Sequence, residues 1–161
     1  MKAEENINMR FAWDDYNPDT MGFVENWLDE YAVKETGMDD GWCEAYKYWL
    51  NDGNTVIGEN YWCKIISESG KPFAVVAIGC HDDIYNIMEI LVNPEERSKG
   101  KGAKVLKDLL GNSEEIIGKK IETAESVIFP SNRASKKAFE KAGFVFNYAH
   151  EDGDALFYIY K

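Results

Sequence analysis

The sequence predicts one domain of the α+β class, or an α/β domain with a mixed sheet. Strand-like and helix-like stretches follow one another in the order β, α, α, β, β, β, α, β, α, β, β. Several neighbouring strands are joined by short turns, which is typical of hairpins and argues against a doubly wound parallel sheet. The 161 residues suit a single domain, residues 1–161, with its own apolar core.

The first third of the chain predicts one short strand and two helices. The strand covers 9–13, "MRFAW". A helix is expected over 17–33 with Asp19 or Thr20 as its cap, because apolar residues recur there at helical spacing. Those residues are Phe23, Trp27, Leu28 and Tyr31. A second helix over 41–54 carries an aromatic stripe and ends at "NDG".

Three strands are expected in the middle of the chain. Residues 60–80 contain two apolar, β-branched runs separated by "ESGKP", which predicts a hairpin. A further strand covers 83–94 and is stopped by Pro94, which cannot donate a backbone hydrogen bond. The middle of the chain therefore predicts an antiparallel part of the sheet.

The last third alternates helices and strands. From Gly102 onward the apolar residues follow the helical period, and 125–130, "ESVIFP", has the pattern of a buried strand. Residues 131–144 predict a short helix that Gly143 closes. Residues 144–161 predict a final hairpin with Asp-Gly at its turn.

Charge is segregated along the chain. The net charge is -11, and residues 1–96 hold 20 acidic and 6 basic side chains, whereas 97–141 hold 6 acidic and 11 basic. This pattern predicts partners of opposite sign for the two regions and argues against nucleic acid. The longest apolar run is 73–80, too short to cross a bilayer, and 1–10 has no secretory signal pattern. We expect a cytoplasmic protein that does not bind membranes.

Cysteine and histidine usage argues against a metal site. The three cysteines, Cys43, Cys63 and Cys80, are widely spaced and form no C-x-x-C motif, which fits a reducing compartment. The two histidines, His81 and His150, are too few for a histidine-rich site.

A glycine-punctuated basic segment, "RSKGKG" (97–102), lies between an expected strand and an expected helix. The first turn of a helix has unpaired N–H groups, and glycine lets an anion approach them, so this segment could cradle a phosphate. It lacks the Ser or Thr of a P-loop and the third glycine of a dinucleotide fingerprint. By itself the motif also fits a solvent-exposed turn.

Two motifs together resemble the GCN5-related N-acetyltransferase (GNAT) superfamily. Arg97-x-x-Gly100-x-Gly102 before an apolar helix resembles its motif A, and "NRASKKAFEKAGF" (132–144) resembles its motif B. The resemblance covers about 55–161. It implies a twisted, mostly antiparallel sheet of about six or seven strands, splayed in the middle and flanked by about four helices.

The resemblance also implies that acetyl coenzyme A binds as the cofactor, with its pyrophosphate on the backbone of 97–102 and its pantetheine arm in the splay. The implied cofactor-binding residues are Leu91, Val92, Arg97, Ser98, Lys99, Gly100, Lys101, Gly102, Ala103, Asn132, Ser135 and Lys136. Asn132 would reach the pantetheine, and Ser135 and Lys136 the phosphates. Asn132 and Ser135 also precede or begin a helix, so either could instead serve as its cap.

Glu89 is the candidate general base, because it is the only ionisable side chain in "IYNIMEILV" and burial would raise its pKa. The family often has its glutamate at the position of Asn86, and a regular strand would point Glu89 to the opposite face. A bulge could restore it, and would also free an amide near 90–92 for the oxyanion. Pairing with a lysine is the competing interpretation.

The general acid departs from the family pattern. Phe139 stands where many relatives have tyrosine, so Tyr148 or Tyr158 would have to donate the proton, or the thiolate leaves unassisted. Both tyrosines also fit strand packing. His81 and His150 are alternative bases, although both also fit exposed loops.

The expected acceptor is a primary amine of a small cationic molecule or a peptide N-terminus. The first helices carry acidic residues interleaved with Trp27, Trp42 and Trp49, which suits a cation, although core packing is the competing interpretation. The acidic residues are Glu25, Asp29, Glu30, Asp39, Asp40 and Glu44. A polyamine, an aminoglycoside-like amine or a basic peptide would satisfy this pattern. The alternative function is a catalytically silent acyl-CoA-binding module, and a homodimer through the final hairpin is compatible with either.

Overall fold

One seven-stranded sheet runs through the residues that the computed structural model describes, 11–36, 38, 41–49 and 54–161. Its strand order is β1-β2-β3-β4-β5-β7-β6, and every neighbouring pair is antiparallel except β4 and β5. The strands are β1 (Ala12–Asp15), β2 (Tyr61–Glu68), β3 (Lys71–His81), β4 (Ile84–Val92), β5 (Ala124–Ile128), β6 (Val145–Ala149) and β7 (Leu156–Tyr160). The predicted mixed, mostly antiparallel sheet is therefore confirmed.

The sheet is splayed between β4 and β5. Only two residue pairs join these strands, Tyr85 with Ala124 and Asn86 with Glu125, yet β4 continues to Val92 and β5 to Ile128. One residue further along, the Ser126 hydroxyl donates a hydrogen bond across this boundary to the carbonyl of Ile87, at 3.0 Å. Beyond that point the two strands diverge, as the resemblance implied.

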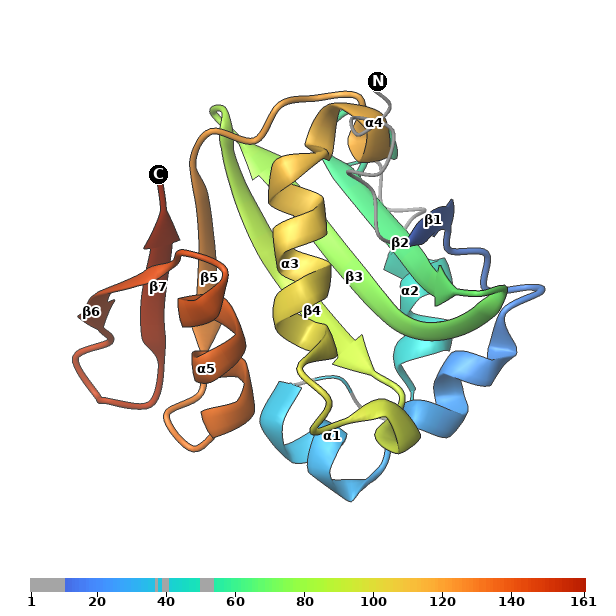
Figure 1. Cartoon of the computed structure of the whole chain (residues 1–161), viewed down its shortest axis with the longest axis horizontal. Helices are drawn as coiled ribbons and strands as arrows, with labels where there is room; N and C mark the ends of the chain where they lie inside the picture. The colour runs from blue at the N-terminus through green and yellow to red at the C-terminus, as the bar shows by residue number, and fades with distance from the viewer. Residues whose placement is uncertain (1–10, 37, 39–40, 50–53) are drawn as a thin grey trace.

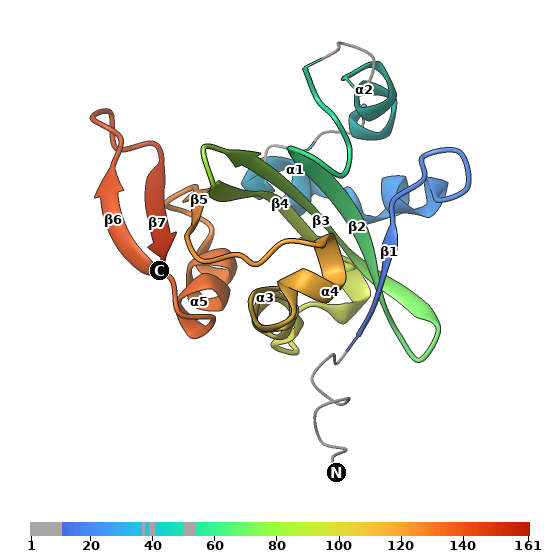
Figure 2. The same ribbon diagram turned by 90° about the horizontal axis from the view of Figure 1, so that it is seen from above.

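Helices cover both faces of the sheet (Figure 1). α3, α4 and α5 pack on one face, and the first helices lie on the other, which is seen best from above (Figure 2). The helical segments are η2 (Gly22–Trp27), α1 (Glu30–Thr36), α2 (Trp42–Trp49), η3 (Pro94–Glu96), α3 (Lys101–Gly111), α4 (Ser113–Ile117) and α5 (Arg133–Lys141). Among the described residues, none of these helices is long and apolar enough to cross a membrane.

Each face of the sheet has its own apolar core. The core under α3, α4 and α5 includes Ile78, Ile87 and Leu106, which are at most 2% exposed. The core under the first helices includes Val75 and Leu91. Alternate residues of the central strands β3 and β4 enter opposite cores, because successive side chains of a strand point to opposite faces.

The first helix differs from its prediction, because the expected helix over 17–33 is divided. A 3₁₀ segment ends at Trp27, and α1 begins only at Glu30. The carboxylate of Asp29 accepts a hydrogen bond from the Ala32 N–H at 2.9 Å and so caps α1. Asp19 instead lies in a local turn in which its N–H donates to Asn17. The capping chemistry was predicted ten residues too early.

The first strand also begins later than predicted. The backbone N–H of Phe11 donates to the buried carboxylate of Asp108 on α3 at 3.2 Å, and the first sheet pair is Ala12 with Ser67. The indole N–H of Trp13 donates to the same carboxylate at 2.9 Å. Residues 9 and 10 of the predicted strand lie outside the described residues. So do residues 50–53 of the predicted second helix.

The hairpins predicted over 60–80 and 144–161 are present, and a third one joins β3 to β4. Ser69 and Gly70 connect β2 to β3 with φ of 53° and 80°, the left-handed values that a two-residue turn between right-twisted strands needs. Asp82 and Asp83 connect β3 to β4 in the same way, with φ of 51° and 66°. The antiparallel pairing of β2, β3 and β4 therefore follows from short turns between strands that are adjacent in the sequence.

We predict that Gly70→Ala lowers the free energy of unfolding by about 1 kcal/mol, because alanine resists the left-handed φ of this turn. A Cβ at Gly70 would meet nothing within 4 Å, so no contact would be responsible. Gly111→Ala is the matched control, since Gly111 ends α3 with equally open space and no positive φ. Urea unfolding should show a loss for the first variant only; equal losses would contradict the prediction.

Candidate active site

A cleft of about 940 Å³ opens where β4 leaves β5. The C-terminal end of β4, the N-terminus of α3, one side of α5 and part of α1 form its walls. The lining residues include Ile90, Leu91 and Val92 from β4, and Phe139 from α5. The cleft therefore lies beside the part of β4 that continues past its last pair with β5, among α1, α3 and α5.

The loop entering α3 presents backbone N–H groups to this cleft. Ser98 and Gly100 have left-handed φ of 65° and 75°, and both line the cleft. Gly100 is the N-cap of α3, and no side chain caps this helix end. The N–H groups of the first turn and the positive end of the helix dipole therefore form a site suited to an anion.

Most of the residues expected to contact a cofactor lie together here. The cleft is lined by Leu91, Val92, Arg97, Ser98, Gly100, Lys101, Gly102, Ala103, Asn132 and Ser135. Lys99 and Lys136 are not among its lining residues. Lys99 is exposed beside Glu96, at 3.4 Å between Nζ and Oε1.

The Lys101 ammonium is directed to neighbouring acids. It lies 2.6 Å from Glu96 and 3.1 Å from Glu68, over the ring of Phe73 at 4.7 Å from its centroid. Its pKa is raised, mainly by the hydrogen bond to Glu96. The ion pairs of Lys101 with Glu96 and Glu68 therefore hold the loop before α3 in place, and the backbone of this loop faces the cleft.

Three cations on α5 were missed by the sequence analysis. Arg133, Lys137 and Lys141 line the cleft and recur every four residues, so they share one face of the helix. Ala134 and Ala138 lie on the same side and leave room beside them. The spacing of four was visible in the sequence and could have favoured Lys137 over Lys136.

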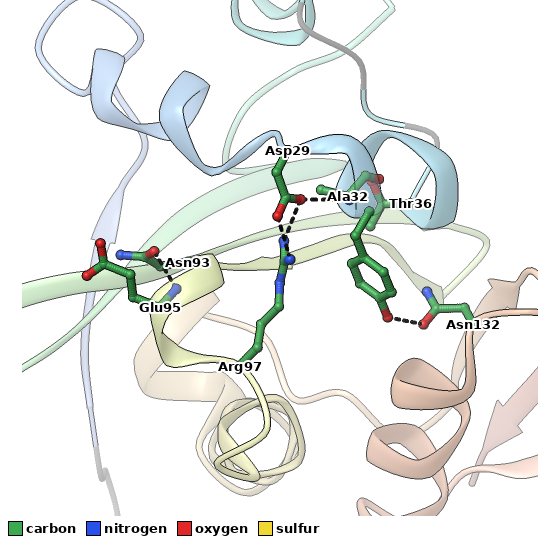
Figure 3. Close-up of polar contacts among 8 residues, drawn as sticks. Asp29, Ala32, Thr36, Asn93, Glu95, Arg97 and Asn132 are labelled. Carbon is green, nitrogen blue, oxygen red and sulfur yellow. Dashed lines mark hydrogen bonds and ion pairs between the residues drawn. The ribbon is translucent and has the colours of Figure 1, made fainter.

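Asn132 joins α5 to α1 across the cleft (Figure 3). Its Oδ1 accepts the Ser135 N–H at 3.1 Å, so Asn132 is the N-cap of α5. The same oxygen accepts the Tyr31 hydroxyl at 3.2 Å, and its Nδ2 donates to the carbonyl of Glu35 at 3.1 Å. The capping interpretation is thus confirmed, and Asn132 is 5% exposed.

Arg97 makes a second link to α1. Its guanidinium binds the carboxylate of Asp29 through two hydrogen bonds, at 2.8 and 3.1 Å, and lies 4.8 Å from the centroid of the Tyr31 ring. The hydrogen bond from Arg97 lowers the pKa of Asp29. Asp29 was expected to face a cationic acceptor, but it is paired with the basic loop instead.

A bulge at Met88 determines the direction of Glu89. Asn86 pairs with Gly79 and Glu89 pairs with Ala77, so three residues of β4 span two of β3. Gly79 and Ala77 share one face of β3, and Glu89 therefore shares a face with Asn86. The bulge that the sequence analysis required is present.

Glu89 follows a residue that lines a second, smaller cavity and precedes one that lines the cleft, and it is itself a lining residue of neither. Its neighbour Ile90 lines the cleft, and its other neighbour Met88 lines a pocket of about 360 Å³. That pocket is lined by Thr55, Asn60, Tyr61, Gly79, Cys80, His81, Ile84, Asn86, Met88 and Glu125. Burial raises the pKa of Glu89 from 4.5 to about 7, so the carboxylate can take up a proton near neutrality.

The two tyrosines proposed as acids line neither cavity. Tyr158 is buried, and its hydroxyl donates to Glu140 at 3.2 Å. Tyr148 is 53% exposed and stacks on Phe157, with ring centroids 4.4 Å apart. Strand packing accounts for both side chains in this structure.

The alternative bases lie at exposed positions. His81 is at the rim of the smaller pocket beside Asp82, 3.3 Å away. His150 lies in the turn between β6 and β7 beside Asp152 and Asp154. Cys80 lines the smaller pocket, and its thiol shares a hydrogen bond with the Tyr85 side chain.

The aromatic residues of the first helices are largely core residues. Trp27 is 6% exposed, and Trp42 packs against Tyr16 and Tyr46 with ring centroids 5.5 Å apart in both pairs. The side chain of Trp49, and residues 39 and 40, are not described. Trp27 therefore supports the core interpretation and offers no face to an acceptor.

Comparisons with known proteins agree with this geometry. A family model described as "Acetyltransferase (GNAT) family" matches residues 12–144. A search of curated protein sequences found no significant match.

Solved acetyltransferase structures are similar over nearly their whole length. AAC(6')-Ib in complex with paromomycin and acetyl-CoA has a TM-score of 0.72 at 17% identity, covering 94% of this chain and 93% of that one. A spermidine N-acetyltransferase mutant from Vibrio cholerae gives 0.67 at 14%, covering 93% and 92%. The ribosomal-protein-S18-alanine N-acetyltransferase from Escherichia coli gives 0.63 at 18%, covering 93% and 92%. At these identities the likeness shows a shared fold.

Asn132→Ala should lower the free energy of unfolding by about 1–2 kcal/mol, because it removes the cap of α5. Asn132→Ser keeps a capping oxygen but loses the contacts to Tyr31 and Glu35, so its loss should be smaller. Asn147→Ala on exposed β6 is the control, expected within about 0.5 kcal/mol of the unsubstituted protein. Denaturant unfolding measures all three; an Asn132→Ala protein as stable as the control would contradict the assignment of the cap.

Proposed function

The chain belongs to the acetyltransferase (GNAT) family, and from that premise we propose that it is an acetyl-CoA-dependent N-acetyltransferase. It would move an acetyl group to a primary amine by direct attack on the thioester. The observation that carries the proposal is the cleft, where an uncapped helix N-terminus and an unpaired strand edge meet.

The residues of the cleft fit coenzyme A. The turn through Ser98 and Gly100 and the first turn of α3 offer N–H donors suited to a diphosphate. Arg133, Lys137 and Lys141 add three positive charges along the opposite wall. A Cβ at Gly102 would lie 3.5 Å from that of Ala138, so glycine here lets α3 approach α5 closely.

The splay would hold the rest of the cofactor. Beyond Ile87 the edge of β4 that faces β5 lies outside the paired region. The amide groups of a pantetheine arm could pair with this edge as an added strand does, since the edge presents N–H and C=O groups. When bound, acetyl coenzyme A supplies a thioester, and residues 90–92 supply backbone donors for its carbonyl oxygen.

Glu89 would act as the general base. Amines are protonated at neutral pH, and only the neutral form is a nucleophile, so a proton has to be removed. Burial raises the pKa of Glu89 to about 7, and Glu89 lies on β4 between Met88, which lines the smaller pocket, and Ile90, which lines the cleft. This position would let its carboxylate take the proton from an amine entering by way of the pocket.

Position 139 is phenylalanine, so no tyrosine at this position can donate a proton to the leaving thiolate. Phe139 is 2% exposed and packs edge-on against Phe144 while lining the cleft. Tyr31 also lines the cleft, but its hydroxyl is directed to Asn132. We therefore propose that the thiolate leaves without protonation by a side chain at that position.

Two measurements test the proposed function. Titration calorimetry with coenzyme A should show binding, and a thiol-release assay with acetyl-CoA and a panel of primary amines should show amine-dependent turnover. No binding of coenzyme A would overturn the proposal. Binding without turnover on any amine would instead favour a silent acyl-CoA-binding module.

Glu89→Gln should lower kcat/KM by about 10²-fold or more, the usual contribution of a general base. In the unsubstituted enzyme kcat/KM should fall as the pH drops through about 7, because protonated Glu89 cannot accept a proton. The variant should lack this limb of the pH profile. Glu122→Gln, an exposed carboxylate before β5, is the control and should keep both rate and profile. A pH limb that survives in Glu89→Gln would assign it to another group.

A further inference from the structure

The loop before α3 brings two basic side chains to the cleft, and both are held by carboxylates of the chain itself. Arg97 and Lys101 line the cleft. The Lys101 ammonium lies 2.6 Å from Glu96 and 3.1 Å from Glu68. The Arg97 guanidinium binds the carboxylate of Asp29 through two hydrogen bonds, at 2.8 and 3.1 Å. The side-chain charges next to the N-terminus of α3 are therefore already neutralised within the chain.

The two pairings differ in how readily an anion can displace the carboxylate. The side chains of Lys101 and Glu96 are 19% and 14% exposed. The pair of Arg97 with Asp29 is more open, with side chains 24% and 41% exposed. Water and salt screen an exposed pair, so it contributes little, whereas breaking a more buried pair leaves an uncompensated charge. Arg97 is therefore the cation of this loop that an incoming anion releases more easily.

The guanidinium of Arg97 is directed away from the cleft toward the start of α1. Figure 3 shows the side chain extended from its loop to Asp29, which is not among the residues that line the cleft. On the way it lies 4.8 Å from the centroid of the Tyr31 ring, and Tyr31 does line the cleft. The guanidinium thus lies over the cleft wall while it stays bonded to a carboxylate outside the cleft.

A diphosphate can compete with Asp29 for this guanidinium. Phosphate oxygens bind arginine through two parallel hydrogen bonds, as a carboxylate does. A diphosphate also carries more negative charge than one carboxylate. The hydrogen bond from Arg97 lowers the pKa of Asp29, so this carboxylate is ionised at neutral pH. Once displaced, it repels the anion that has taken its place.

The loop has supports that do not depend on Asp29. The side chain of Asn93 accepts the Glu95 N–H at 3.0 Å, and the Asn93 N–H donates to the carbonyl of Phe73 on β3 at 2.7 Å. The ion pairs of Lys101 hold the other end of the loop. Loss of the Asp29 carboxylate therefore removes a competitor for Arg97 and leaves the backbone donors of the loop in place.

We propose that Asp29 is a built-in competitor of the cofactor: it holds Arg97 when no anion is bound, and the diphosphate of coenzyme A displaces it. This inference rests on the proposed function, which supplies the ligand. The competition lowers the affinity for coenzyme A and so favours release of this product after acetyl transfer. The exchange also unties the loop from α1, which forms part of the cleft wall through Tyr31, Ala32 and Thr36.

Titration calorimetry with coenzyme A tests the competition. Asp29→Asn removes the charge but keeps an oxygen that can cap the Ala32 N–H, so α1 retains its cap. The Kd should fall about threefold to fivefold, which is the contribution of an exposed ion pair expressed as a ratio. Glu30→Gln, at the exposed next residue, removes the same charge and should change the Kd by less than about 1.5-fold. Thermal unfolding confirms that each variant is folded.

A second pair of measurements assigns the gain to Arg97 and to the diphosphate. Arg97→Gln should weaken binding, and Asp29→Asn in that background should change the Kd no more than Glu30→Gln does, because no guanidinium remains to be released. Dephospho-coenzyme A keeps the diphosphate and lacks the 3′-phosphate, so Asp29→Asn should tighten its binding equally. A gain that persists without Arg97, or that needs the 3′-phosphate, would overturn the inference.

The remaining outcomes separate this inference from the proposed function. If Asp29→Asn weakens the binding of coenzyme A, or changes it no more than the control does, Asp29 does not compete and the inference is wrong while acetyl transfer stands. If coenzyme A binds to none of the proteins, the proposed function fails, and inorganic pyrophosphate is titrated in its place. Tighter binding of pyrophosphate by Asp29→Asn would then support the competition, and no binding or no gain would overturn it.

Discussion

The incomplete pairing of β4 with β5 is the constraint from which the rest of the site follows. Two strands held together by two residue pairs must diverge if each continues along its own direction. The divergence leaves the edge of β4 unpaired where the cleft opens. The cleft extends to the N-terminus of α3. A regular sheet at this boundary would satisfy those backbone groups and leave no space for a ligand.

The two cavities are positioned by the same boundary. The large cleft lies at the open end of the splay, and the small pocket lies against the paired end. The Met88 bulge falls between them and turns Glu89 to the face of the small pocket. One irregularity of a single strand therefore turns an ionisable side chain to the face that Asn86 occupies, and its burial there raises its pKa to about 7.

Helix α1 connects the two walls of the large cleft. Asp29 binds Arg97 on the loop before α3, and Tyr31 and Glu35 bind Asn132 at the start of α5. The ion pair is partly exposed, so by itself it adds about 1 kcal/mol or less to stability. Its structural effect is larger, because it fixes the loop whose backbone lines the cleft. The cations along the cleft wall come chiefly from α5, whereas Lys101 is held by Glu96 and Glu68.

Local chemistry in the sequence was enough to predict the strands, the hairpins over 60–80 and 144–161, and the glycine-containing loop before α3. These features depend on only a few neighbouring residues. Examples are the turn residues Ser69 and Gly70, the two-residue alternation of the strands, and the glycines at 100 and 102, so they could be predicted without a structure. Tertiary structure decided the contacts between distant segments, because no local pattern reports them. It paired Asp29 with Arg97, 68 residues away, and gave Asn132 a partner in Tyr31, 101 residues away. It also shifted the register at Met88 and brought Glu125 beside Asn86, since register depends on which strands become neighbours.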